Sequence, residues 1–307
     1  MKKQNSRILF IPFYVQCPHL RYSASARMRA EWPAKYLHAD IGGFGSSLCQ
    51  YDLIIFQKCY NEKFQENIKR LKGFVPEIKI AFDLCDPEWL GKSSDVVMRM
   101  IELVDFIIVP TKKMKEWFTE NFPNKNCYVI PDGHDLDYYY NGRYFPEQVN
   151  EPMKYVWYGN SGTIKSLEAI LPILEGCSRK GDQLIIIADE PAREAINSQI
   201  LDVKFIEWGL ETVNGNVCRG NLVLNPRLDT PQYSFKSNNK TVMAYILGLP
   251  CIDLLANDEV NWNLKLEYFR DAGNRACDVN GKRGELIDEF GMRNVVKIWK
   301  KVLAKEL

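Results

Sequence analysis

The sequence lacks the features that mark membrane-spanning, disulfide-stabilised and histidine-ligated metal proteins. None of its apolar runs approaches the roughly 20 residues that cross a bilayer. Its nine cysteines form no C-x-x-C pair and their number is odd, which indicates scattered reduced thiols of a cytosolic protein. With three histidines in the whole chain, a histidine-based metal site is not expected.

A strong charge of one sign is also missing. Lysine and arginine number 40 against 39 aspartates and glutamates, so the net charge of +1 gives no signal for a polyanionic partner, although it does not exclude a local basic groove. The composition, 46% hydrophobic and 26% charged residues, is typical of a globular protein, and 307 residues suffice for two α/β domains. The start, MKKQNSRILFIPF, has a short apolar run that contains Pro12 and lacks a cleavage site, so we expect a first strand and no signal peptide.

Apolar runs bounded by turn residues alternate with segments of helical period through most of the chain. Such alternation predicts an α/β protein with parallel sheets and crossover helices. We expect strands at residues 7–13, 52–57, 79–83, 106–110 and 127–130, and then at 154–157, 183–187, 203–206, 221–225 and 251–254. Helices are expected at 25–38, 62–71, 94–103, 112–121 (with Thr111 as N-cap), 164–177, 191–199 and 238–247, and a basic amphipathic helix over 294–307.

One segment, residues 138–152, is rich in turn residues and has neither period, so we expect it to join two domains. The predicted division is a first domain over 1–145, a second domain over 146–290 and a terminal helix over 291–307.

The stretch 225–253 contains a pattern suited to an anion. An apolar strand ends at Asn225, and Ser237 is expected to cap a helix that Gly248 ends. Lys236 and Lys240 lie one turn apart beside the free N–H groups of that helix N-terminus. The alternative is a capped amphipathic helix with two solvated lysines.

The run F-K-S-N-N-K, a short helix and then L-G-L-P-C-I resembles the nucleotide-sugar site of GT-B glycosyltransferases, in particular those of glycosyltransferase family 4. Further parts of the chain look like other segments of that family, namely VDFIIVPTKKMKEWFTENF…YVIPDGHDLDYY, KYVWYGNSGTIKSLEAILPIL, SARMRAEWPAKYL and KIAFDLCDPEW. The resemblance covers most of the chain. It implies two Rossmann-like domains that face a central cleft, with the acceptor on the N-terminal side, the nucleotide-sugar in the C-terminal domain, and a last helix that crosses back to the first domain.

The resemblance also implies which residues hold the donor. Its diphosphate would be bound at Lys236, Ser237, Asn238, Asn239 and Lys240, the segment that matches the family's phosphate site. Arg227 is a third cationic candidate, although it can equally pair with Asp229. A further contact is expected from the loop Gly159, Asn160, Ser161 and Gly162, for which a plain strand-to-helix turn is the alternative. The glutamate that usually binds the ribose is absent, because Met243 and, one motif length earlier, Phe235 stand at the corresponding positions.

Three residues are candidates for the chemistry. Asp83 and Asp86 end a predicted strand of the first domain and could orient an acceptor hydroxyl or accept its proton. They could also cap the next segment or pair with Arg27 or Arg29. Arg27, near the start of its helix, is a candidate ligand of an anion. No metal site and no cofactor are expected, since the nucleotide-diphosphate sugar is a co-substrate and GT-B enzymes generally need no bound metal.

The leading hypothesis is a glycosyltransferase that moves a sugar from a nucleotide-diphosphate donor to a hydroxyl of a glycan, a lipid-linked saccharide or a modified DNA base. The resemblance implies that the transfer retains the anomeric configuration of the sugar. One alternative is a compact phage-type transferase that acts on DNA bases, for which a basic and aromatic surface is available from Arg21, Arg27, Arg29, Lys35, Tyr22 and Trp32. Another is an inactive nucleotide-sugar-binding protein, which Met243 suggests. We expect a cytoplasmic protein, or one in the host-cell cytoplasm if phage-encoded. The alternative is a protein bound peripherally at the membrane surface through its basic terminal helix.

Overall fold

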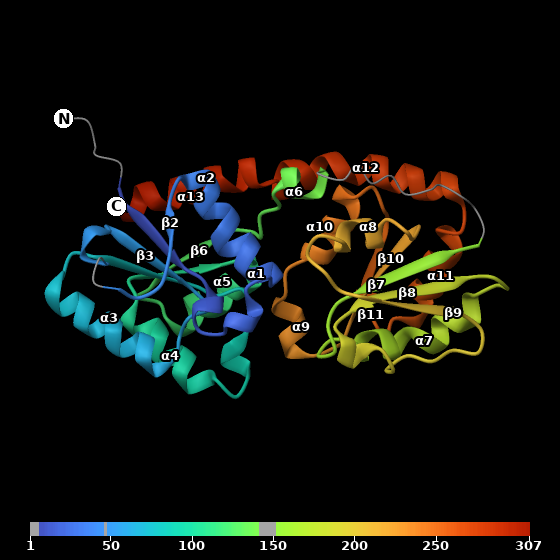
Figure 1. Ribbon diagram of the computed structural model, residues 1–307, viewed down its shortest axis with the longest axis horizontal. Coiled ribbons are helices and arrows are strands. Elements are labelled where there is room, and N and C mark those ends of the chain that lie inside the picture. Colours follow the sequence, from blue (N-terminus) through green and yellow to red (C-terminus); the bar gives the residue numbers. More distant parts are fainter. Residues whose placement is uncertain (1–5, 46–47, 141–151) are drawn as a thin grey trace. The chain divides into compact units, whose positions relative to one another are not determined.

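The structure is a computed structural model that describes residues 6–45, 48–140 and 152–307 (Figure 1). The chain forms two compact units. The first unit comprises Met1–Asp135, Ser234–Ser237 and Glu289–Leu307, and the second comprises Leu136–Tyr233 and Asn238–Asp288. The predicted domain boundary at residues 145/146 lies outside the described residues. The C-terminal segment belongs to the first unit.

The first unit is built on a parallel sheet of six strands in the order β2-β1-β3-β4-β5-β6. Its strands are β1 (Ile8–Ile11), β2 (Asp40–Ile41), β3 (Leu53–Gln57), β4 (Lys79–Asp83), β5 (Phe106–Val109) and β6 (Asn126–Val129). β3 and β5 are buried along their whole length, because helices cover both faces of the sheet.

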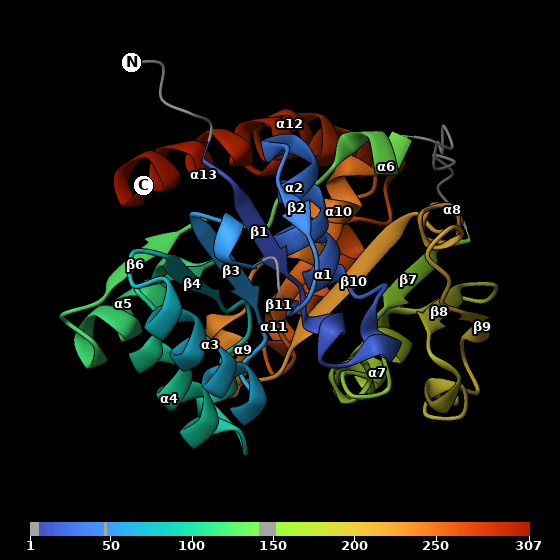
Figure 2. The same cartoon turned by 60° about the vertical axis from the view of Figure 1, so that its left-hand side comes forward.

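Helices of the first unit lie on opposite faces of this sheet (Figure 2). α3 (Glu62–Phe74), α4 (Ser94–Leu103) and α5 (Lys112–Asn121) form a core with one face. α1 (Ala24–Ala26), a π-helical turn over Arg27–Glu31, α2 (Trp32–Leu37) and α13 (Met292–Glu306) complete the unit. Trp299 of α13 meets Phe10 of β1 edge-on, with ring centroids 5.5 Å apart, which fixes the last helix on the other face.

The second unit has a parallel sheet of five strands in the order β11-β10-β7-β8-β9. Its strands are β7 (Lys154–Tyr158), β8 (Gln183–Ala188), β9 (Asp202–Glu207), β10 (Leu222–Arg227) and β11 (Cys251–Leu255). Its helices are α6 (Leu136–Tyr140), α7 (Lys165–Cys177), α8 (Val213–Val217), α10 (Asn239–Ile246), α11 (Glu259–Tyr268) and most of α12 (Ala272–Phe290), and α9 (Pro231–Phe235) begins there. No helix within the described ranges combines the length and the apolar character that a membrane crossing requires.

The predicted fold class is confirmed, since the chain forms two parallel sheets covered by helices. All ten predicted strands are present, and Thr111 caps α5 as expected by accepting a hydrogen bond from the N–H of Met114. Gly248 follows α10 with a φ of 84°, the left-handed conformation that ends helices. The central cleft stays a prediction.

The helix predicted at 191–199 is wrong, because the structure has only a short 3-10 turn over Glu190–Ala192. After this turn the hydroxyl of Ser198 accepts hydrogen bonds from the N–H groups of Ile200 and Leu201, a local turn that leads the chain into β9. The sequence analysis also missed α11 and α12. Only Arg275 and Val279 are buried along the 19 residues of α12, so that helix carries too little apolar periodicity to be recognised.

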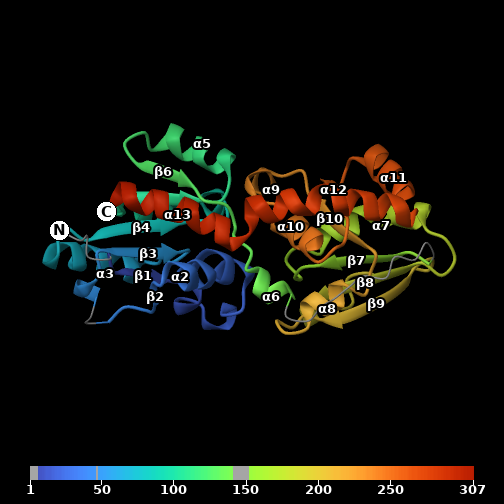
Figure 3. The same ribbon diagram turned by 90° about the horizontal axis from the view of Figure 1, so that it is seen from above.

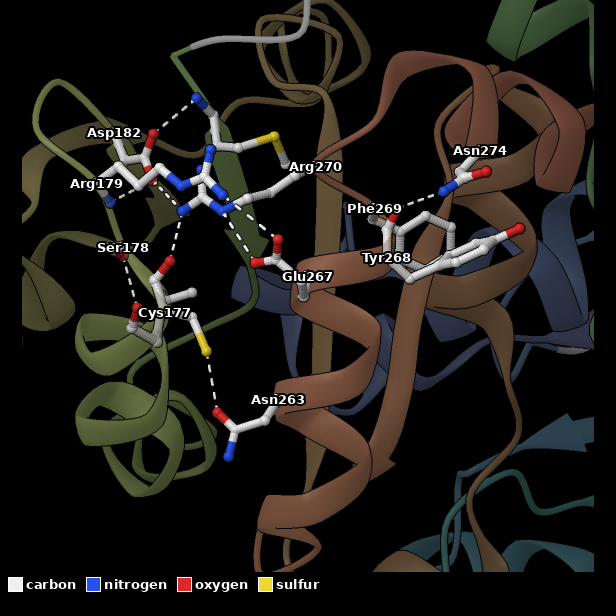
Figure 4. Close-up of polar contacts among 12 residues, drawn as sticks. Cys177, Ser178, Arg179, Asp182, Asn263, Glu267, Tyr268, Phe269, Arg270 and Asn274 are labelled. Carbon is white, nitrogen blue, oxygen red and sulfur yellow. Dashed lines mark hydrogen bonds and ion pairs between the residues drawn. The ribbon is translucent and has the colours of Figure 1, made fainter.

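A buried ion pair fixes the junction of α11 and α12 to the sheet of the second unit (Figure 4). The guanidinium of Arg270 donates to a carboxylate oxygen of Asp182 at 2.7 Å and to the carbonyl of Cys177 at 2.5 Å. The same carboxylate accepts the N–H groups of Met153 and Arg179. The side chains of Arg270 and Asp182 are 6% and 1% exposed, so the two opposite charges compensate each other away from water.

We predict that Arg270→Ala lowers the free energy of unfolding by about 3–5 kcal/mol, because it leaves the charge of Asp182 buried without its partner. Arg179→Ala is the matched control: its guanidinium is half exposed and pairs with Glu267 at the surface, and its loss should cost less than about 1 kcal/mol. Urea unfolding of both variants measures the difference. Equal losses would show that the Arg270 pair does not hold the junction.

Candidate functional site

In each sheet the chain order of the strands reverses once. β1 lies between β2 and β3 in the first sheet, and β7 lies between β8 and β10 in the second. Open parallel sheets bind ligands outside the carboxyl ends of the strands at such reversal points. The segments that follow β1 and β3, and those that follow β7 and β10, are therefore where each unit is expected to bind a ligand.

Two cavities lie at the other ends of the strands, where the strands begin. One of about 660 Å³ is lined by Lys154, Gln183 and Asn221 at the amino ends of the second sheet's strands, and one of about 460 Å³ by Asp52 and Lys79 at those of the first. Size alone does not identify a site, and the chemistry of the carboxyl ends decides the choice here.

Lys58 is the central cation at the reversal point of the first sheet. It directly follows β3, and its ammonium group lies 2.8 Å from a carboxylate oxygen of Asp86 and 2.7 Å from one of Glu88. The same group lies 5.1 Å from the ring centre of Phe13, in the segment after β1. Although burial disfavours its charge, Asp86, Cys85 and Glu88 raise the pKa of Lys58. This lysine is thus a fixed positive charge.

The backbone of Lys58 is also strained. Its φ is 56°, a left-handed conformation that is costly for a residue with a side chain, and its N–H donates to the carbonyl of Asp83. Such strain is concentrated at functional sites. Sequence analysis did not single out Lys58, although its place directly after a predicted strand was a usable signal.

Asp86, predicted as a catalytic residue, is held by Lys58 and stays ionised. Burial alone would raise its pKa, but the charges of Lys58 and Lys236 lower it below its usual range. Because its carboxylate is a weak base, Asp86 is better suited to orient a hydroxyl or a cation than to remove a proton. Its side chain remains 38% exposed and can contact a ligand.

Asp83, the other carboxylate candidate, is fully buried and forms an ion pair with Arg29. The guanidinium of Arg29 donates to both of its oxygens, at 2.7 and 3.0 Å. Burial raises the pKa of Asp83 to about 6, against the opposing charge of Arg29. The ion-pair alternative is thus what the structure shows, and a direct contact of Asp83 with a substrate is not available.

The network continues from Arg29 to Asp132 and Ser237. Arg29 lies 3.5 Å from one carboxylate oxygen of Asp132, and the hydroxyl of Ser237 donates to the other at 2.5 Å. Asn238, not Ser237, is the N-cap of α10, and its side chain makes no cap hydrogen bond. The predicted capping role of Ser237 is wrong because α10 begins at Asn239, one residue later than that role requires.

Arg27 lies in the π-helical turn, a rare conformation that is common at functional sites. Its guanidinium is 5.5 Å from the ring centre of Trp32. Burial, with a contribution from the charge of Arg27, lowers the pKa of His134 to about 3, so that histidine is neutral. Of the predicted basic and aromatic surface, Arg27, Arg29 and Trp32 are buried and cannot contribute, whereas Arg21, Tyr22 and Lys35 are exposed.

In the second unit the first turn of α10 lies over the end of β7. The ammonium group of Lys240 is 5.0 Å from the ring centre of Trp157 and 5.6 Å from that of Tyr158. The hydroxyl of Tyr158 donates to the backbone carbonyl of Lys240 at 2.6 Å, which fixes the start of the helix. Of the predicted donor segment, Asn238, Asn239 and Lys240 belong to this unit, whereas Lys236 and Ser237 belong to the first.

The loop after β7 meets the same tryptophan. A Cβ atom at Gly159 would lie 2.6 Å from the ring of Trp157, so only glycine fits there. The N–H and hydroxyl of Ser161 both donate to the carboxylate of Asp189, at 2.6 and 2.7 Å. Asp189 thus occupies the place that the prediction gives to a phosphate beside Ser161. Asn160 closes the turn through Thr163, and Gly162 follows Ser161 in this loop.

Arg227, the third cationic candidate, ends β10 and binds the carboxylate of Asp253 through two hydrogen bonds of 2.5 and 2.8 Å. The sequence offers Asp229 as a near neighbour, but the partner that the structure shows is Asp253, which the pairing of β10 with β11 brings beside Arg227. Thr241 of α10 donates to the same carboxylate at 2.5 Å and accepts from Asn225 at 3.3 Å. This chain of hydrogen bonds ties α10 to the ends of β10 and β11.

The two positions where the family has acidic residues are apolar and packed. Met243 is 8% exposed within α10, and Phe235 meets Trp89 edge-on with ring centroids 5.4 Å apart. Asp135 and Asp137 form a D-x-D sequence, a pattern that binds metal in other transferases, but Asp135 here accepts hydrogen bonds from Lys35 and Tyr36. Among the described residues no group of three or more His, Cys, Asp or Glu side chains is placed to hold a metal.

The sequence matches no family model and no curated protein. Its fold, by contrast, is similar to that of solved glycosyltransferases. An alpha-glucosyltransferase in complex with UDP and a 13-mer DNA containing a HMU base is 11% identical, with 98% of this chain and 99% of that chain covered and a TM-score of 0.65. An alpha-glucosyltransferase in complex with UDP-glucose and DNA containing an abasic site is 10% identical, with 97% of this chain and 99% of that chain covered and a TM-score of 0.64.

A structure of S. aureus TarM in complex with fondaparinux, alpha-GlcNAc-glycerol and UDP is 10% identical, with 81% of this chain and 55% of that chain covered and a TM-score of 0.58. The fold is that of GT-B glycosyltransferases. The comparisons establish the architecture, and the residues of each site must carry any argument about activity.

We predict that Lys58→Met raises the pKa of Asp86, because the largest charge that lowers it is removed. A depressed carboxylate pKa stabilises the fold above the unfolded pKa of about 3.9, and this contribution disappears as the pH falls through the folded pKa. The variant should therefore lose about 2 kcal/mol at pH 7 and less at pH 3. Urea unfolding at both pH values and an NMR titration of the Asp86 carboxyl measure these effects.

Lys58→Arg, which keeps the charge, serves as the control and should leave the pKa of Asp86 lowered. A stability loss in Lys58→Met that is equal at the two pH values would contradict the electrostatic account and assign the loss to packing.

Proposed function

We propose that this protein is a glycosyltransferase that moves a sugar from a nucleotide-diphosphate donor to a hydroxyl acceptor. The observation that carries the proposal is the position of Lys240: its ammonium group lies over Trp157, beside the Gly159 loop, at the reversal point of the second sheet. Solved GT-B structures with UDP or UDP-glucose support a nucleotide donor, and UDP is the nucleotide we propose.

The proposed chemistry needs the negative charge of the departing diphosphate to be stabilised. Lys240 supplies a positive charge, and the first turn of α10 supplies free N–H groups and the positive end of the helix dipole. The ammonium group of Lys240 lies over the rings of Trp157 and Tyr158, and these contacts orient its charge before the donor binds. Arg227 is committed to Asp253 and is proposed to support α10 instead of contacting the donor.

For the acceptor, we propose that Asp86 orients the hydroxyl in the first unit. Its ionised carboxylate accepts a hydrogen bond, and Lys58 keeps it ionised across the physiological pH range. Arg27 and the loop residues Gly159 and Asn160 remain proposed ligand contacts. Membership of family 4, retention of the anomeric configuration and independence of metal are the finer parts of the proposal, and they rest on the resemblance of the sequence.

A second candidate acceptor is a modified base in DNA. It is favoured by two alpha-glucosyltransferase structures that contain DNA and whose whole length this chain matches. The third hypothesis, a binding protein without activity, rests on Met243 in place of the ribose glutamate. All nine cysteines are free thiols, which supports a cytoplasmic location.

The experiment that tests the proposal is a thermal-shift screen without added metal against UDP, GDP, dTDP, CDP and ADP and their sugar conjugates. A ligand that binds only the folded state raises the melting temperature, and at 100 times its Kd the gain is about 2.7 kcal/mol. We expect a shift with UDP and UDP-glucose. No shift with any nucleotide in a folded sample would contradict a donor site, and donor binding without transfer or hydrolysis would favour the inactive binding protein.

We predict that Lys240→Ala weakens donor binding by about ten- to a hundredfold, since a hydrogen bond to a charged group contributes about 1.5–3 kcal/mol. Lys265→Ala is the matched control, because Lys265 also lies over two aromatic rings, Tyr268 and Phe269, in the same unit. Titration calorimetry with UDP measures both variants. Unchanged affinity in Lys240→Ala would show that the diphosphate binds elsewhere.

A further inference from the structure

The outer face of α13 carries a row of exposed basic side chains. Its five basic residues, all exposed, are Arg293, Lys297, Lys300, Lys301 and Lys305. None of the five is in an ion pair with a described residue; the ammonium of Lys297 contacts only Asn294, and that of Lys305 lies over the ring of Tyr128.

Spacings of three and four residues place these cations along one side of the helix, over about 18 Å of its axis. The only acidic residue of α13 is Glu306, which is occupied by Tyr128 and Asn126 at the edge of the sheet. The basic face is therefore not neutralised along its length. Figure 3 shows the ribbon of α13 with no other element of the first unit drawn in front of it.

The opposite, apolar face of α13 is already used by the fold. Val295, Trp299 and Val302 are buried against the first sheet and α2. A helix that enters a membrane surface needs an apolar face free to insert between lipids. α13 has none to offer, so its outer face can interact with a partner only through charge.

Another surface helix of the same unit shows that this pattern is not a general property of the chain. α3 exposes Lys63, Lys69 and Arg70, but Glu62 and Glu66 lie between them at helical spacing, and Glu62 pairs with Arg99. Interleaved charges of both signs are typical of a solvated face. An unmixed row of five cations is typical of a face that meets a polyanion.

We propose that the outer face of α13 is a docking surface for the phosphate backbone of duplex DNA. A straight row of cations suits a rod that carries one negative charge per about 1.7 Å of its axis, so about ten phosphate charges lie along the length of the basic face. Contacts of this kind position a duplex and do not read its sequence. The surface is separate from the residues proposed to bind the donor.

The test is fluorescence anisotropy with a labelled 20-base-pair duplex of unmodified bases, without donor, at 50–300 mM salt. Each phosphate contact contributes about −0.9 to the slope of log K against log salt, so four to five contacts give a slope of about −4. The triple variant Lys297→Gln, Lys300→Gln, Lys301→Gln should bind at least about tenfold more weakly and show a slope less steep by about 3.

The matched control removes the same charge from α3, by Lys63→Gln, Lys69→Gln and Arg70→Gln, and should leave the slope unchanged. All six substitutions are at exposed positions, and equal melting temperatures verify that both triple variants are folded. A thermal shift with UDP, measured in parallel, separates this inference from the proposed function: loss of DNA binding in the α13 variant should leave the UDP shift intact.

Three results would overturn the inference. The first is absence of duplex binding by the unaltered protein at 50 mM salt, and the second is an equal slope in the α13 and α3 variants. The third is binding of the protein to vesicles rich in phosphatidylserine, lost in the α13 variant, while the duplex is not bound, which would assign the face to anionic lipid.

Discussion

Burial of both faces of each parallel sheet is the constraint on which the rest of this structure depends. Inside such a sheet most strand side chains are apolar, and polar groups gather towards the carboxyl ends of the strands. Gln57 and Asp83, the last residues of β3 and β4, are both fully buried and must find partners at the same edge. Gln57 accepts the N–H of Phe13, and Asp83 pairs with Arg29. The polar cluster around Lys58 is built on these two fixed ends.

The same constraint explains how much the sequence reveals. Continuous apolar runs identify every strand of both sheets except the two-residue β2, whose residues Asp40 and Ile41 are exposed and carry no such run. Alternation of strands with amphipathic helices predicts the fold class, and Thr111 and Gly248 mark helix ends through local chemistry. α12 is not predicted because its buried face consists of Arg275 and Val279, which is too few apolar residues to give a helical hydrophobic period.

The candidate site is less predictable, because the pairing of strands, and not proximity in the sequence, determines which side chains form ion pairs and hydrogen bonds. Arg227 has an aspartate two residues away, yet it binds Asp253, since β10 and β11 run side by side with Asn225 opposite Asp253. Ser161 binds Asp189 at the end of the neighbouring strand β8 for the same reason. The strain at Lys58 has no sequence signal at all, because lysine is not a residue that favours a positive φ.

The net charge of +1 adds together charged residues in two different environments, namely buried cations paired with carboxylates and exposed cations at the surface. Arg29, Lys58 and Arg270 are buried and matched by carboxylates, so they add nothing to the field outside the protein. The five cations of α13 are exposed to solvent and form no ion pair with a described residue. At physiological ionic strength charges are screened beyond about 8 Å, so a partner at the surface responds to the local row and not to the total. Balanced composition is therefore no argument against a polyanionic partner for this chain, since the balance is reached by pairing in the interior and separation at the surface.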